Sequence, residues 1–150
     1  MFRSVSFTAP LLAAMMLLLC GCQRVTEADK AAAIETVKQN IAAMQAENME
    51  AMAATIHSQS PHFERSKMQT EAIFKIYDLH YTLKNLAIQS ATPDTIRISF
   101  EQVTVKLRGP EEFQNSRFTG VHVLKKENGA WKLWSIENPI NTPLDDEPEK

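Results

Sequence analysis

Apolar residues at helical spacing run through the chain from about residue 28 to residue 56. Intervals of three to four residues are typical of a helix that packs one face on a sheet. Thr26 stands before the stripe and can cap the free amide at the third helical position. The residues of the stripe are Ile34, Val37, Ile41, Met44 and Met52.

Two polar residues, Gln45 and Asn48, interrupt this stripe. Either one helix continues with two amides facing the interior, or it breaks near Glu47 and Asn48 caps a second short helix that ends near Ile56. Because asparagine is a favoured N-cap, we favour the break.

A third helix is predicted to begin near Ser66, after the turn-forming residues 58–61. Residues at steps of three to five form one continuous face of this helix, and Asp78 points away from that face. The predicted buried face consists of Met68, Ala72, Ile73, Ile76, Tyr77 and His80.

From Tyr81 onward the pattern changes to strands. Alternation predicts strands over residues 81–90, 95–107, 117–126 and 130–137, and Asn128 with Gly129 forms a hairpin turn. Within the second strand the apolar positions move from even to odd numbers, which predicts a β-bulge near residues 101–102. Residues 138–144 are expected to be irregular. The fold class is therefore α+β, with three N-terminal helices on a bent antiparallel sheet.

Both faces of the last hairpin are apolar. A strand with one wet face alternates apolar and polar residues, so this hairpin should be covered on both sides. One cover is the helices, and the other is either a second molecule or the segment 138–144. In the strand over residues 117–126, Val121 and Val123 lie on one face and Phe118 and Leu124 on the other. In the strand over residues 130–137, Trp131 and Leu133 lie on one face and Trp134 and Ile136 on the other.

The first residues have the features of an export signal. Arg3 precedes an unbroken apolar run over residues 11–20, which is too short to span a bilayer and suits a secretory signal peptide. The residues Leu19, Cys20, Gly21 and Cys22 resemble the bacterial lipobox, and this resemblance identifies Cys22 as the lipidated residue. Cys20 is a poor rival, because the bulky Leu19 would then occupy the small-residue position.

The predicted organisation is a lipoprotein signal peptide over residues 1–21, the lipidated Cys22 with a tether over 22–27, a folded domain over 28–142 and a disordered acidic tail over 143–150. Lipid chains would hold the mature protein on a membrane of the cell envelope without spanning it. In similar lipoproteins of Gram-negative cells the residue after the cysteine sorts the product, and Gln23 implies the periplasmic face of the outer membrane.

Charge and cysteine content exclude several classes of function. The 150 residues include 16 Lys and Arg and 18 Asp and Glu, for a net charge of -2, which argues against a nucleic-acid partner. Both cysteines lie in the export segment, so the folded domain has no thiol for a disulfide, for catalysis or for zinc. No cofactor is expected.

Three parts of the chain together resemble the nuclear-transport-factor-2-like superfamily, which includes SnoaL-like proteins. They are the opening helix with Ile34, Val37 and Ile41, the short unit over residues 48–57, and the closing hairpin over 125–133. The resemblance implies a pocket between the concave sheet face and the helices, and frequent homodimers through the sheet. It implies no reaction, because fold does not fix function. The main alternative is another helix-plus-sheet domain, such as a cystatin-like one.

Few ionisable side chains are predicted to face the interior. His80 or His122 can serve as a general base, with Tyr77 or Tyr81 as a hydrogen-bond donor. The alternative is that all four are packing residues, since no carboxylate shares their predicted faces to orient a histidine.

Two further histidines, His57 and His62, flank a Ser/Pro turn. No carboxylate partner or HExxH spacing accompanies them, so we predict no metal site.

These observations leave three hypotheses for the function. The first is a lipid-anchored envelope protein whose domain binds a small apolar ligand or a protein without catalysis. The second is a structural, self-associating module whose cone is closed by its own side chains. The third is an isomerase, dehydratase or cyclase that uses a histidine base in the cone. We favour the first, because no catalytic constellation is evident.

Overall fold

Helix α1 begins at a capping box. The Thr26 hydroxyl accepts a hydrogen bond from the Asp29 amide (3.1 Å), and the Asp29 carboxylate accepts one from the Thr26 amide (3.0 Å). These bonds satisfy amides that have no partner within the helix. In the computed structural model, which describes residues 24–144, α1 spans Glu27–Gln45 and buries Val37 and Ile41 as predicted.

The predicted break after α1 is confirmed. Glu47 adopts a φ of 51°, and the Asn48 side chain accepts a hydrogen bond from the Ala51 amide (2.9 Å). Helix α2 spans Met49–Ala54, and Met52 is buried. The short helix therefore turns one side chain into the interior.

Helix α3 differs from the prediction at both ends. It spans Phe63–Ile76, so it begins before Ser66 and ends before Tyr77. Met68 is 66% exposed and Ile76 is 51% exposed, so the predicted buried face is wrong at these two residues, whereas Ile73 and Tyr77 pack against the core. The physical reason is that α3 packs mainly on α2 and stands away from the sheet over most of its length, so much of its inner face borders open space.

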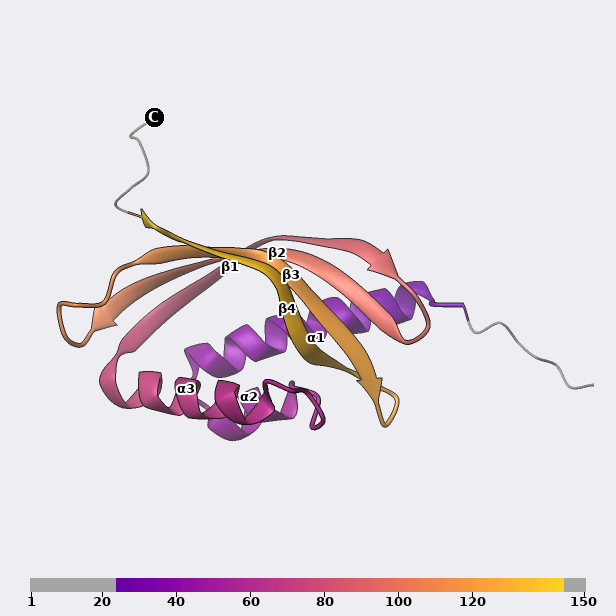
Figure 1. Ribbon diagram of the computed structural model, residues 1–150, viewed down its shortest axis with the longest axis horizontal. Coiled ribbons are helices and arrows are strands. Elements are labelled where there is room, and N and C mark those ends of the chain that lie inside the picture. Colours follow the sequence, from indigo (N-terminus) through magenta and orange to yellow (C-terminus); the bar gives the residue numbers. More distant parts are fainter. Residues whose placement is uncertain (1–23, 145–150) are drawn as a thin grey trace, which may run out of the picture.

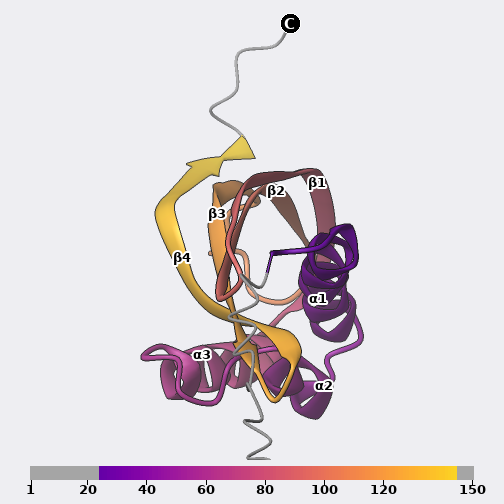
Figure 2. The same cartoon turned by 90° about the vertical axis from the view of Figure 1, so that its right-hand side faces the viewer.

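Four antiparallel strands follow in the order β1 (Asp78–Ala91), β2 (Thr95–Arg108), β3 (Ser116–Glu127) and β4 (Ala130–Pro143). The sheet lies over the helices, with α1 crossing beneath it (Figure 1). Viewed from the end, the sheet curls from β1, beside α1, round to β4, which comes down toward α2 and α3 (Figure 2). This is the predicted architecture of three helices on a strongly curved sheet.

The bulge predicted in β2 lies instead on β1. The pairing of β2 with β3 is unbroken from Thr95 to Thr104. Across from it, Lys84 pairs with Glu101 and Ala87 pairs with Ser99, so β1 carries the extra residue, and Asn85 there has a φ of 53°. The inner face of β2 keeps its even phase throughout, with Ile96, Ile98, Phe100 and Thr104 buried.

Strand β4 continues through the segment that was predicted to be irregular. It runs to Pro143, and Ile140 pairs with Thr119. Asn138, with a φ of 48°, and the following proline form an irregularity opposite Gly120, which lets the strand resume after it. Segment 138–143 is therefore part of the sheet and does not fold over its outer face.

An ion pair covers part of the outer face of β3. Arg97 on β2 and Glu137 on β4 approach to 3.3 Å, so the two side chains reach across β3, which lies between them. Beneath this pair Val121 and Val123 are buried. A homodimer through the sheet stays a prediction.

Two clusters form the core between the helices and the sheet. The second of them centres on Ile41, Leu79 and Tyr81. The described members of both clusters lie within residues 24–144. No helix within these residues is long and apolar enough to cross a membrane. The first cluster contains Ala33, Val37, Ile96, Ile98, Leu124, Trp131 and Leu133.

The predicted export segment lies outside the described residues. This applies to the signal peptide over 1–21 and to Cys22, and residues 145–150 of the predicted tail also lie outside them.

Candidate functional site

An open cavity of about 380 Å³ lies between the three helices and the inner face of β3 and β4. Small-molecule pockets in proteins have volumes of about 300–1,000 Å³. The lining comes from all three helices, the α2–α3 loop and two strands: Asn40, Met44, Met52, Ile56, Ser60, His62, Arg65, Ser66, Gln69, Thr70, Phe118, His122, Leu133, Trp134, Ser135, Ile136 and Pro139.

Helix α3 turns a polar face toward this cavity. His62, Arg65, Ser66, Gln69 and Thr70 recur at helical spacing, and all five line the cavity. The sequence prediction missed the role of this face because it followed the apolar residues of the helix. Five polar residues on one face of a helix that is expected to pack on a sheet were the signal that could have revealed it.

Three buried side chains in the lining keep hydrogen-bonding groups without a partner among residues 24–144. Thr70 is 8% exposed and His122 is 7% exposed, and neither the hydroxyl nor the ring makes a hydrogen bond there. Asn40 donates from Nδ2 to the Thr55 hydroxyl (2.7 Å), but its Oδ1 accepts from no donor. Their polar atoms are accessible from the cavity rather than sealed in the core, so they can meet polar atoms of a bound molecule or of water.

The His122 imidazole lies at the floor of the cavity. Its ring stacks on Phe100 with 4.0 Å between centroids and an interplanar angle of 23°. Burial lowers the pKa of His122 from 6.5 to about 4. The ring is therefore neutral near pH 7, and one nitrogen donates while the other accepts.

The cavity lining contains no Asp or Glu residue. Nothing in the lining can therefore act as the carboxylate that orients and charges a catalytic histidine. Arg65 is exposed at the α3 side of the cavity and has no ion pair within residues 24–144. The site thus has the uncharged His122 ring at its base and the positive charge of Arg65 at its edge.

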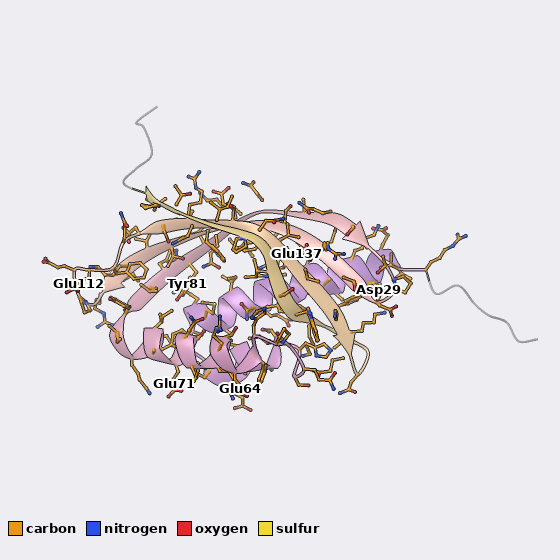
Figure 3. All side chains as sticks on the ribbon, viewed as in Figure 1. Asp29, Glu64, Glu71, Tyr81, Glu112 and Glu137 are labelled. Carbon is orange, nitrogen blue, oxygen red and sulfur yellow. The ribbon has the colours of Figure 1, made fainter. Side chains whose placement is uncertain are left out.

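The predicted cluster of Tyr77, His80 and Tyr81 does not reach the cavity. Burial first, and the charge of Glu47 second, raise the pKa of Tyr81 to about 12, and its hydroxyl is buried without a hydrogen-bond partner in the described part of the chain. Figure 3 places Tyr81 on β1, close to where that strand follows α3. The Tyr77 ring packs on Phe113, with centroids 5.0 Å apart. Both tyrosines belong to the second core cluster.

His80 is exposed on the outer face of β1, where it pairs with Val105. The prediction that it shares a buried face with Tyr77 is wrong. The helix ends at Ile76, so residue 80 follows the alternation of a strand rather than the turn of a helix. Of the four candidates, only His122 lines the cavity.

His57 has a structural environment. The Gln59 amide donates to its Nδ1 (3.1 Å), so the proton of a neutral ring is on Nε2, and the ring meets the Trp134 ring edge-on at 5.0 Å. Glu127 lies 3.6 Å from Nδ1, but its carboxylate is held by Ser58, which is also the main cause of the lowered pKa of Glu127. No group of three His, Cys, Asp or Glu residues within 24–144 is arranged to hold a metal ion.

Comparison of sequences matches residues 35–143 to a family described as the C-terminal domain of the anti-sigma-I factor RsgI9. The anti-sigma-I factor RsgI9 of Acetivibrio thermocellus is 29% identical to this chain over 70 residues. That match covers 47% of this chain and 10% of the relative, so the matched part spans only about a tenth of that protein's length.

Solved structures share the fold. A putative dehydratase of the NTF2-like family from Streptomyces avermitilis superposes with a TM-score of 0.63 at 14% identity, over 79% of this chain and 99% of that one. A protein of unknown function with a cystatin-like fold from Nostoc punctiforme gives a TM-score of 0.59 at 18% identity, over 77% and 94%. A putative scytalone dehydratase from Novosphingobium aromaticivorans gives 0.62 at 16%, over 75% and 84%. At these identities the likeness establishes the NTF2-like fold alone.

Proposed function

Because this chain belongs to the family of the anti-sigma-I factor RsgI9 C-terminal domain, we propose that it is a regulatory or sensory binding module that takes up a small, mainly apolar molecule without transforming it. The observation that carries this proposal is the cavity of about 380 Å³ between the helices and the sheet. A structural module whose cone is closed by its own side chains would leave no such space.

The chemistry of the lining favours binding over catalysis. His122 is neutral near pH 7, and no carboxylate lines the cavity to assist it. Met44, Met52 and Leu133 give the cavity apolar surface, and removing the apolar surface of a ligand from water against it favours binding. The polar groups on α3 and β3 can fix the orientation of the ligand. Dehydratase appears in the names of some proteins that share the fold, but those proteins are too distant to transfer an activity.

Anchoring to a membrane is a separate part of the proposal. It is supported by the lipobox resemblance around Cys22 and by the apolar run before it. We propose that lipid on Cys22 holds the domain at the cell envelope, on the periplasmic face of the outer membrane in a Gram-negative host. Expression of the full chain and of Cys22→Ser in a bacterium tests this: the unchanged chain should fractionate with membranes and incorporate labelled palmitate, and C22S should do neither. Equal fractionation and labelling of the two chains would contradict lipidation.

The binding proposal is tested with a neutral fluorescent probe, N-phenyl-1-naphthylamine, whose emission rises in apolar surroundings. The protein is the chain from residue 23 to residue 150, which contains both core clusters. We expect saturable binding of one probe per chain. Ser66→Trp, which puts a large ring into the cavity lining, should abolish it, and Ala72→Trp, on the exposed side of the same helix, should not.

Absence of saturable binding, or equal binding by S66W and the unchanged protein, would contradict the proposal. Turnover of a hydroxylated or halogenated ring compound that is lost in His122→Gln would replace the proposal with the enzyme hypothesis.

A further inference from the structure

We infer that the cavity selects organic anions, with the apolar body of the ligand inside and its carboxylate or other anionic group against the N-terminal turn of α3. This inference rests on the proposed binding function and names the class of ligand. It comes from the placement of charge and of free donors around the cavity.

Two backbone donors in the first turn of α3 have no acceptor within residues 24–144. His62 is the N-cap residue of α3 but its side chain makes no capping hydrogen bond. The backbone amides of Glu64 and Arg65 have no acceptor among the described residues, although the Phe63 amide bonds to the Ser60 carbonyl (3.1 Å). Free amides and the helix dipole make the start of a 14-residue helix attractive to an anion.

A cationic side chain stands at the same turn. Arg65 lines the cavity and has no ion pair within residues 24–144. The nearest acid in sequence, Glu64, is not part of the lining; it lies 3.9 Å from Lys67, and Figure 3 shows it on the side of α3 away from the sheet. Within residues 24–144 no carboxylate pairs with the Arg65 guanidinium, so it is available to an added group in the two-pronged geometry that suits a carboxylate.

Independent evidence that this is a ligand site lies deeper in the cavity. Thr70, two turns along α3 from His62, and His122, across the cavity on β3, are both more than nine-tenths buried and have no hydrogen-bond partner in the described part of the chain. Both are uncharged near pH 7, so they suit a hydroxyl, carbonyl or amide of the ligand rather than its charge. The anionic end must therefore lie at Arg65, and the cavity has a definite polarity.

The test compares two probes that share one ring system. 8-Anilino-1-naphthalenesulfonate carries a sulfonate, and N-phenyl-1-naphthylamine does not. Both are titrated into the chain from residue 23 to residue 150, into Arg65→Gln, and into Lys75→Gln. The second variant removes the same charge from the same helix, at a position that is not part of the lining. Arg65 is exposed, so R65Q should fold as the unchanged protein does, which circular dichroism checks.

We expect R65Q to weaken binding of the sulfonate about threefold to tenfold, the range for a partly exposed charge-assisted pair, and to change binding of the neutral probe less than about twofold. K75Q should leave both unchanged, and S66W should abolish both. A loss of sulfonate binding in K75Q equal to that in R65Q would overturn the inference, because the effect would then be one of net charge.

Equal weakening of both probes by R65Q would also overturn it, since Arg65 would then contribute packing alone. If the neutral probe binds and the sulfonate binds no more weakly to R65Q, the cavity is a ligand site without the proposed polarity. If neither probe binds the unchanged protein, the proposed function itself fails. The two failures are therefore distinguishable.

Discussion

The neutral His122 makes the stability of this domain depend on pH in a way that one substitution can isolate. Burial lowers its pKa from 6.5 to about 4 in the folded state, and the unfolded chain keeps the ordinary value. Between these two values the unfolded chain binds a proton that the folded domain does not. The free energy of unfolding therefore rises as pH increases from 4 to 6.5, and falls as pH decreases through that window.

The size of the effect follows from the two pKa values. A pKa difference from 6.5 to about 4 changes the free energy of unfolding by about 3.4 kcal/mol over the whole titration range, at about 1.4 kcal/mol per pKa unit. Between pH 7.5 and pH 5 about 2 kcal/mol of this is expressed, because the unfolded chain is then mostly protonated at this histidine and the folded domain is not. A change of that size is a large fraction of the stability of a domain.

The assay is urea unfolding of the chain from residue 23 to residue 150 at pH 7.5 and at pH 5, for the unchanged protein, for His122→Gln and for His80→Gln. Carboxylates with lowered pKa values, Asp29 and Glu127 among them, lose their stabilising contribution mainly as pH falls below their ordinary pKa values of 3.8 and 4.5, which lie below the two pH values compared, and they are the same in all three proteins. We expect H122Q to lose about 2 kcal/mol of the pH dependence. H80Q, which changes an exposed histidine on the outer face, should keep it. If H122Q retains the full difference between the two pH values, the ring is not held neutral and the account of the cavity floor is wrong.

Three further predictions follow from other parts of the fold. Asp29→Asn should lower the thermal midpoint, because it removes the charge that pairs with Lys126 (2.8 Å) where the hairpin meets the start of α1, and 1 M NaCl should narrow the difference; equal midpoints at low salt would contradict this. Leu124→Ala should lower the free energy of unfolding by about 2–5 kcal/mol in urea, since Leu124 is fully buried in the first core cluster, and a loss well below that range would mean that the cluster collapses around the gap. If the predicted homodimer forms through the sheet, light scattering should give a dimer mass, and Ile140→Asp, which places a charge at an exposed apolar position of β4, should give a monomer mass; a monomeric unchanged protein would contradict the homodimer.

Local signals were sufficient for the opening of the chain. The break between α1 and α2 could be predicted because the Asn48 side chain accepts the hydrogen bond of the Ala51 amide, a contact between residues only three positions apart. The hairpin turn at Gly129, with a φ of 81°, is equally local. Neither feature depends on what packs against it, which is why the sequence alone was informative.

The errors arise where tertiary context decides. A periodic apolar pattern predicts a buried face on the assumption that a helix packs on a core, but the inner face of α3 borders a cavity and is polar, so Met68 was placed on the wrong side. Extending that helix past Ile76 then turned His80 inward. Residues 138–144 were predicted to be irregular, but an irregularity at Asn138 lets β4 continue to Pro143.

The candidate site could be predicted only in part. Alternation within β3 suggested an inward position for His122, and the structure confirms that position. The polar face of α3 depends on the distance between that helix and the sheet, which no spacing in the sequence reveals. The bulge on β1 was attributed to β2 because a phase change along a strand also arises when its outer face carries apolar residues such as Val103 and Val105.

The central claim is that the cavity between the helices and the sheet admits a ligand, and methionine methyl resonances test it most directly. Met44 and Met52 line the cavity, and Met68 is exposed on the far side of α3. In a ¹³C-methyl-methionine spectrum of the chain from residue 23 to residue 150, titration with N-phenyl-1-naphthylamine should shift the signals of Met44 and Met52 in a saturable way and leave that of Met68 in place. A shift confined to Met68, or no saturable shift of the two cavity methyls, would contradict the account.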